Sequence, residues 1–125
     1  LRGGEMPGGS KYEGSPEKLE EYTAVVEQSH TGAEVKGAKN PYTSRNGHMF
    51  SFLDRDGAMA VRLSDELTAA FRSEYDSGDV TQYGATMRGY SSVPAELLAD
   101  TDAMAGWFEK AWNWIGTLPP KPTKK

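Results

Sequence analysis

The amino-acid sequence predicts an α+β fold of two layers, in which helices cover one side of an antiparallel sheet. Apolar residues recur at helical spacing near both ends of the chain, and two short apolar runs flank an Asp-Gly pair between them. The connections are too short for the long crossovers that parallel strands need. The predicted element order is therefore α-β-β-β-α-β-β-α.

The first helix is predicted to begin at residue 16. Ser15 is a suitable N-cap, and the proline that follows it suits the first helical position, where no backbone donor is needed. An apolar stripe then runs along an otherwise acidic segment, and it consists of Leu19, Tyr22, Val25 and Val26. Thr31-Gly32 marks the end of the helix. A short strand is predicted at 33–38, followed by a polar loop at 39–47.

The clearest hairpin lies at residues 48–63. Its two apolar runs flank Asp56-Gly57, a pair suited to a two-residue turn with positive φ. Such a turn fixes the register of the two strands and places opposed side chains on the same face. The pairs predicted on the buried face are Phe52 with Val61, and Phe50 with Leu63.

The second helix is predicted to begin after Ser64, whose side chain can cap it and which two acidic residues follow. Its predicted inner face consists of Leu67, Ala70 and Phe71. A turn is predicted at 76–79, and two further strands are predicted at 80–83 and 86–93.

The last helix has the strongest periodic signal in the chain. Its apolar stripe consists of Met104, Phe108, Ala111, Ile115 and Leu118, widened by Trp107 and Trp114. Helical projection places Trp112 on the other flank, where an exposed tryptophan would be a suitable interface anchor. Trp112 is therefore the candidate partner-binding residue. The alternative is that a broad apolar face simply extends to it.

Composition limits the class of protein. The 125 residues carry a formal net charge of -4 and no cysteine, which excludes disulfides and thiolate sites. No apolar run approaches the roughly 20 residues of a membrane helix, and no secretory signal is evident. We therefore expect a cytoplasmic bacterial protein without membrane association. It is divided into a disordered glycine-rich tail at 1–15, a single domain at 16–118 and a basic tail at 119–125.

No residue pattern indicates catalysis or metal binding. His30 and His48 lack the spacing of metal ligands, and they are interpreted as a helix-end residue and a strand-start residue. Asp54-Arg55-Asp56-Gly57 resembles the start of a calcium loop, but no glutamate closes it, so it is interpreted as a hairpin turn. The carboxylate pairs Asp76/Asp79 and Asp100/Asp102 suit turns and helix caps. We therefore expect no catalytic residue, no metal and no cofactor.

A mildly basic surface is a second candidate site. Its candidate nucleic-acid or anion-binding residues are Lys36, Lys39, Arg45, His48, Arg62 and Arg88. With Tyr42 and Tyr90 nearby, these cations could contact phosphates while the rings stack on bases. The alternative is ordinary solvation of a sheet rim and a loop, because the net charge is acidic.

Several short motifs lie in the second half of the chain. They are Met87-Arg88-Gly89-Tyr90, Val93-Pro94, Glu96-Leu97-Leu98-Ala99-Asp100, Trp107 with Ala111, and Leu118-Pro119-Pro120-Lys121, preceded by Asn46-Gly47-His48-Met49-Phe50 and Asp56-Gly57. Together they resemble the TfoX N-terminal domain family, which includes the front half of the TfoX (Sxy) competence regulators and stand-alone bacterial proteins. The resemblance spans residues 16–121, although Ser51 stands where that family usually has glycine. It implies a two-layer, secretion-chaperone-like fold and no catalytic residues.

Three functions follow from these observations. The first is a small non-enzymatic binding domain that acts through a protein partner, with a regulatory role that the resemblance implies. The second is a nucleic-acid-binding module that uses the basic surface. The third is a small enzyme or ligand-binding protein with a pocket that the sequence does not reveal. The expected oligomeric state is a monomer or a homodimer.

Overall fold

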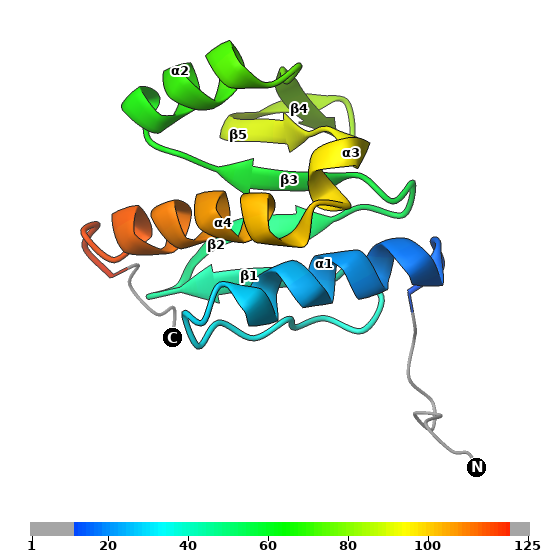
Figure 1. The fold of residues 1–125 in the computed structure, drawn as a ribbon. Coiled ribbons are helices and arrows are strands. Elements are labelled where there is room, and N and C mark those ends of the chain that lie inside the picture. Colours follow the sequence, from blue (N-terminus) through cyan, green and yellow to red (C-terminus); the bar gives the residue numbers. More distant parts are fainter. Residues whose placement is uncertain (1–11, 121–125) are drawn as a thin grey trace.

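The computed structural model describes residues 12–120, so the predictions for 1–11 and 121–125 lie outside the described residues. The helices and strands are shown in Figure 1 and have these bounds: α1 Pro16–Gln28, β1 Tyr42–Arg45, β2 His48–Leu53, β3 Met59–Arg62, α2 Asp65–Glu74, β4 Asp79–Gln82, β5 Ala85–Val93, α3 Ala95–Leu98 and α4 Thr101–Ile115. The strands form one antiparallel sheet in the order β1-β2-β3-β5-β4.

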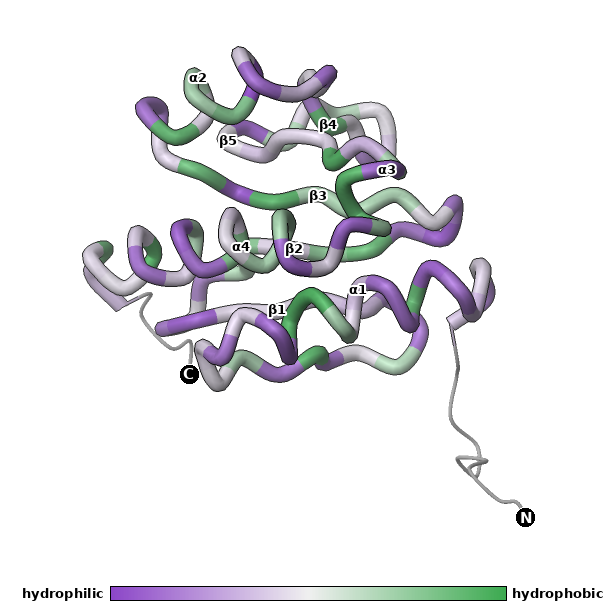
Figure 2. Tube along the Cα trace, in the orientation of Figure 1, coloured by the Kyte–Doolittle hydropathy of each residue, from purple (hydrophilic) through white to green (hydrophobic). Residues whose placement is uncertain are grey.

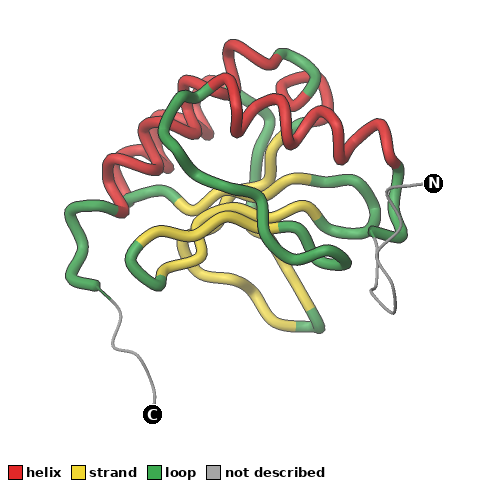
Figure 3. The backbone as a smooth tube through the Cα atoms, turned by 90° about the horizontal axis from the view of Figure 1, so that it is seen from below, coloured by secondary structure: helices red, strands yellow, loops and turns green. Residues whose placement is uncertain are grey.

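The helices lie together on one face of the sheet, and Figure 3 shows that no helix of residues 12–120 covers the opposite face. We call this second face the open face. The arrangement confirms the predicted α+β class, with helices on one side of an antiparallel sheet. None of the helices in residues 12–120 is long and apolar enough to cross a membrane.

The helix starts follow the capping rules. The hydroxyl of Ser15 accepts the backbone N–H of Lys18, and that of Ser64 accepts the N–H of Leu67. A carboxylate oxygen of Asp100 accepts the N–H of Ala103 at the start of α4. Each cap satisfies a backbone donor that has no partner inside its helix.

The hydrophobic core lies between the helices and the covered face of the sheet. Figure 2 shows hydrophobic residues concentrated along β3 and on the helix segments next to it. The largest buried side chains include Tyr22, Phe71, Met104, Phe108 and Ile115 from the helices, and Phe50, Leu53, Met59 and Val61 from the strands. The predicted stripes of α1 and α4 are thus confirmed, except that Leu19, Trp107 and Trp114 are half-buried and that α4 ends at Ile115, before the half-buried Leu118. In α2, Phe71 is buried as predicted, whereas Ala70 is exposed and was wrongly placed inside.

One polar chain crosses this core. The hydroxyl of Tyr22 in α1 is hydrogen-bonded to Ser51 Oγ at 2.7 Å, and Ser51 Oγ is 2.5 Å from Thr43 Oγ1 in β1. Ser51 and Thr43 are fully buried, so each of these hydroxyls needs its partner. The serine therefore joins α1 to the first two strands.

The first predicted strand is wrong. Residues 33–38 contribute only an isolated bridge, in which Lys36 and Tyr42 exchange backbone hydrogen bonds at 2.8 and 2.9 Å. The first strand is instead Tyr42–Arg45, inside the segment predicted to be a polar loop. It pairs with β2 through a two-residue turn at Asn46-Gly47, where both φ angles are positive. The short helix α3 was not predicted.

The predicted register of the second hairpin is wrong by one residue. Ser51 pairs with Val61 and Phe52 with Ala60, because the turn is wider than two residues. The carboxylate of Asp54 widens it by accepting the N–H groups of Asp56 and Ala58, at 2.9 and 3.0 Å. A one-residue slip moves a side chain to the other face of a sheet. Phe52 therefore lies on the open face and is half-buried.

The prediction of a disordered tail up to residue 15 extends too far along the chain. Tyr12 packs against the core cluster, and its hydroxyl donates a hydrogen bond to the backbone carbonyl of Asp54. Glu13 lies within ion-pair distance of Lys39 and Arg55. Residues 12–15 therefore belong to the folded domain. At the other end, the carbonyl of Pro119 lies 2.8 Å from His48 Nε2.

Candidate functional site

The open face of the sheet contains a groove of about 860 Å³. Apolar and aromatic side chains line it, with amides and charges at the rim. Its aromatic and methionine lining consists of Tyr42, Met49, Phe52, Tyr83 and Met87. We call this hollow the open-face groove.

Phe52 and Met49 of β2 form the floor of the groove. Phe52 lies opposite Tyr42 of β1, and its ring is 5.5 Å from the ring of Tyr90 in β5. The hydroxyl of Tyr90 donates a 2.8 Å hydrogen bond to the backbone carbonyl of Met49. These contacts bring β1, β2 and β5 together below the groove, so the floor is held in a fixed position.

The loop before β1 forms one rim of the groove. The bridge between Lys36 and Tyr42 closes this loop, and residues 37–41 line the groove. Gly37 has a φ of +79°, and a β-carbon there would lie 3.1 Å from the ring of Tyr42. A larger residue at this position would therefore be strained, and its β-carbon would clash first with the backbone oxygen of Asn40, at 2.5 Å.

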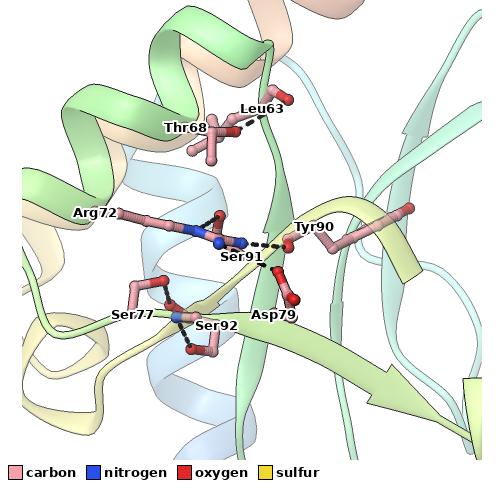
Figure 4. A network of polar contacts seen from close by, with 9 residues as sticks. Leu63, Thr68, Arg72, Ser77, Asp79, Tyr90, Ser91 and Ser92 are labelled. Carbon is pink, nitrogen blue, oxygen red and sulfur yellow. Dashed lines mark hydrogen bonds and ion pairs between the residues drawn. The ribbon is translucent and has the colours of Figure 1, made fainter. Parts of the chain in front are cut away.

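The β4–β5 hairpin forms the opposite rim, and α2 holds its base. Arg72 of α2 donates from Nε to Ser91 Oγ at 3.1 Å and from one Nη to the carbonyl of Tyr90 at 3.2 Å, as Figure 4 shows. Its other Nη contacts a carboxylate oxygen of Asp79 at 3.2 Å. Ser77 donates to the carbonyl of Ser92 at 2.7 Å. The residues at the base of the β4–β5 hairpin are therefore held in place by α2.

Carboxylates outnumber cations around the groove. Glu13 lies 3.8 Å from Lys39 and 3.9 Å from Arg55, so both cations of the lining share one carboxylate. Asp54 is occupied by the backbone of its turn. The exposed carboxylate of Asp56 has no Lys, Arg or His partner within 4 Å in the described chain. Among residues 12–120, the rim thus has one acidic group without a cationic partner.

Burial affects the acidity of the tyrosine below the floor. Loss of solvent raises the pKa of the Tyr90 hydroxyl to about 12, against the opposing effect of the Arg62 charge. In the unfolded chain a tyrosine ionises near pH 10. The folded state therefore holds this proton more tightly, and the resulting stability is lost as the pH rises from about 10 towards 12.

We expect the free energy of unfolding to fall by roughly 1 kcal/mol between about pH 9 and about pH 11 because of Tyr90. Urea denaturation at both pH values measures this change. Tyr90→Phe should be less stable at the lower pH, because it lacks the bond to Met49, and should lose less on going to the higher pH. Some dependence should remain, because burial also raises the pKa of Tyr22. Equal losses in both proteins would contradict the assignment.

The polar groups of the groove lining include amides, two cations and three carboxylates. Neither histidine lines it, and its carboxylates are those of Glu13, Asp54 and Asp56. Within residues 12–120, no three His, Asp or Glu side chains are arranged to hold a metal ion. A neutral apolar floor with a few polar groups at its edge suits recognition of an apolar surface.

The structure divides the predicted basic set between two ends of the sheet. Lys36 and Lys39 lie at the start of β1, and only Lys39 lines the groove. The other members, Arg45, His48, Arg62 and Arg88, lie towards the opposite end. Arg62 and Arg88 share a shallow hollow of about 490 Å³ with Trp114 and the exposed carboxylate of Asp65. The six cations therefore do not form one surface.

The prediction that Trp112 is exposed is wrong. Its ring lies 6.0 Å from that of Phe50, edge to face, and the guanidinium of Arg45 covers it at 4.4 Å from the ring centre. Arg45 also donates a 2.9 Å hydrogen bond to the carbonyl of Trp112. Trp112 and Trp114 are both half-buried and pack against the core cluster. Trp112 is therefore part of the packing between α4 and the sheet.

Lys39 is the one candidate of the sequence analysis that lines the groove, and the aromatic and methionine residues of the groove are not among the candidates. Tyr42 and Tyr90 were noted only as neighbours of the basic set, and Phe52 was assigned to the core. Tyr83 and Met87 carried no signal beyond membership of a strand or motif. The signal in the sequence is the alternation of apolar and polar residues in the predicted hairpin. Met87 and the half-buried Val80 oppose each other there, which indicates a partly apolar face.

Comparison with known proteins does not place the chain in a family. No family model matches it, and neither curated proteins nor solved structures give a match.

Proposed function

We propose that this chain is a binding domain, not an enzyme, and that its open-face groove takes an extended segment of a protein partner. The observation that carries the proposal is the apolar groove on the face of the sheet that no helix covers. Most of a sheet's apolar face is normally buried, and an uncovered apolar hollow with a polar rim is typical of an interaction site.

Charge favours a protein segment over a nucleic acid in this groove. The lining contains three carboxylates, Glu13, Asp54 and Asp56, against the two cations Lys39 and Arg55. Phosphate groups would be repelled by this balance, since nucleic-acid affinity comes mainly from cations that neutralise the backbone. A segment with one or two lysines or arginines would instead find the carboxylate of Asp56.

The lining also favours a particular kind of segment. Tyr42, Phe52 and Tyr83 give the groove three aromatic side chains, and Pro41 lies beside them. Grooves with aromatic linings recognise proline-containing segments, which are already extended and lose little entropy on binding. Met49 and Met87 add flexible apolar surface that adapts to different side chains. We therefore propose an extended segment that contains proline, other apolar residues and a cation.

The broader assignment is a regulatory, cytoplasmic domain similar to the TfoX N-terminal domain. The helix-covered antiparallel sheet is compatible with the two-layer fold that the resemblance implies. The motif at Met87–Tyr90 supports it further, because its glycine lies where β5 bends.

The test is the binding of a labelled synthetic peptide made of Pro-Leu-Pro-Lys repeats, followed by fluorescence anisotropy. We expect a dissociation constant of about 10–100 micromolar, in the range of small transient interfaces. Phe52→Ala should weaken binding about ten-fold or more, because it removes the floor. Asp56→Asn should weaken it less, and salt should then have a smaller effect. Asp102→Asn is the matched control, because it removes an exposed carboxylate on α4.

Three outcomes count against the proposal. A peptide of Pro-Leu-Pro-Glu repeats that binds equally well would overturn the role of Asp56. Binding that is unaffected by Phe52→Ala, in a variant that still unfolds cooperatively, would place the peptide elsewhere. Tight binding of a single-stranded oligothymidine that competes with the peptide would favour the nucleic-acid module instead.

A further inference from the structure

The outer part of the β4–β5 hairpin projects from the domain. We call residues 80–89 the arm. None of them belongs to the hydrophobic core cluster, and most are exposed. The base of the hairpin, by contrast, is fixed to α2 through Arg72, Ser91 and Asp79 (Figure 4). A two-stranded ribbon without a packed face is marginally stable by itself, so the arm has freedom to move that the base does not have.

The arm bends at a bulge in β5. Asp79 pairs with Ser91, but Val80 pairs with Met87, so the residues from 88 to 90 have no counterpart in β4. Gly89 lies within this bulge and has a φ of +86°, which favours glycine strongly. The bend brings the inner side of the arm, with Met87 and the tip, to the open-face groove.

The two-residue turn at the tip of the arm has an unusual residue in its first position, whereas the turn between β1 and β2 has the usual asparagine. Both turns have two central residues with positive φ: Asn46-Gly47 at 55° and 82°, and Tyr83-Gly84 at 53° and 78°. Asparagine and glycine adopt this conformation readily, whereas a tyrosine in the first position is strained. Within the described part of the chain, side-chain packing does not compensate for this strain, because the Tyr83 side chain is 96% exposed.

An exposed, strained aromatic residue at a groove points to a binding role. Tyr83 is the only large hydrophobic side chain in residues 12–120 that is classed as exposed, and it lines the open-face groove. We propose that Tyr83 is a binding residue, which the arm brings down onto the segment that occupies the groove. This inference rests on the proposed function and identifies the side chain that covers the partner opposite Tyr42 and Phe52.

The test compares Tyr83→Asn, Tyr83→Phe and Asn46→Tyr with the unmodified chain, using the same Pro-Leu-Pro-Lys peptide. Tyr83→Asn should bind the peptide about ten-fold more weakly, while Tyr83→Phe should bind within about two-fold, because the ring makes the contact. Tyr83→Asn should also melt at the same or a higher temperature, because its turn becomes Asn-Gly. Asn46→Tyr is the matched control for the turn and should melt at a lower temperature without a change in affinity.

Two further measurements separate this inference from the proposed function. Hydrogen exchange of the arm amides should slow when the peptide is added to the unmodified chain, and should slow less in Tyr83→Asn. The neutral dye Nile red provides a second probe, whose fluorescence in the groove should fall in Tyr83→Asn.

The outcomes are distinct. If the peptide binds and Tyr83→Asn binds it equally well, the role of Tyr83 is overturned and the proposed function stands. If the peptide does not bind but the dye responds to Tyr83→Asn, the choice of a peptide partner fails and Tyr83 remains a groove-binding residue. If neither probe responds, both proposals are overturned.

Discussion

Replacement of Phe108 by alanine is expected to lower the free energy of unfolding by about 3–5 kcal/mol. Phe108 is fully buried in α4, and its ring lies 5.1 Å from that of Phe50 in β2. Removal of the ring leaves a cavity between the longest helix and the sheet, bounded by backbone that cannot collapse freely. Since small domains are stable by only about 5–15 kcal/mol, this loss is a large fraction of the total free energy of unfolding.

Urea denaturation followed by circular dichroism measures this loss. Glu109→Ala is the matched control, because Glu109 is the next residue of α4 and is exposed. It should change the free energy of unfolding by less than about 0.5 kcal/mol. A Phe108→Ala loss below about 1 kcal/mol would mean that α4 does not pack on β2 as described.

The sequence was sufficient wherever local chemistry determines the structure. Ser15, Ser64 and Asp100 cap their helices with their own side chains, and the stripes of α1 and α4 were visible as helical spacing. Helix starts depend on a few neighbouring backbone donors, so they can be identified from adjacent residues.

The strands were harder to predict because their pairing is set by distant partners. Segment 33–38 alternates in the manner of a strand, yet it adds only one bridge outside β1. The more polar segment at 42–45 becomes β1 because Asn46-Gly47 turns it onto β2. Polarity alone cannot distinguish a partly exposed edge strand from a loop.

The groove could not be predicted because its floor depends on the strand register, and the predicted register is wrong by one residue. Phe52 belongs to the open face because Asp54 widens the turn by binding two N–H groups, while an irregularity in the pairing of β1 with β2 keeps Phe50 on the covered face. The pair Asp56-Gly57 suits a two-residue turn equally well by sequence. The opposite rim depends on the bulge at Gly89, whose position requires knowledge of both strands.

Trp112 shows the limit of helical projection. A projection assigns faces from positions along one helix, and it placed Trp114 inside and Trp112 outside. The position of Trp112 is instead determined by Arg45 and Phe50, which lie in other elements. A guanidinium group that stacks on an indole shields much of that ring face from water, as a hydrophobic side chain would.

Trp112→Ala is therefore expected to lower the free energy of unfolding by about 2–3 kcal/mol, somewhat below the range for a fully buried tryptophan because the ring is half-buried. It removes the edge-to-face contact with Phe50 and uncovers Arg45. Trp114→Ala should cost less, because the Arg62 guanidinium lies farther from its ring, at 5.4 Å, and its ring has no edge-to-face contact like that of Trp112 with Phe50 among the described residues. The order of the two effects is the reverse of the one that helical projection predicts.

A double-mutant cycle with Arg45→Met isolates the stacking of Arg45 on Trp112. The hydrogen bond from Arg45 ends on the backbone carbonyl of residue 112, so Trp112→Ala leaves its acceptor in place. The coupling free energy then reports the side-chain contact, and we expect about 0.5–1 kcal/mol. A coupling near zero, together with a Trp112→Ala loss below about 0.5 kcal/mol, would restore Trp112 as an exposed residue and as a candidate interface anchor.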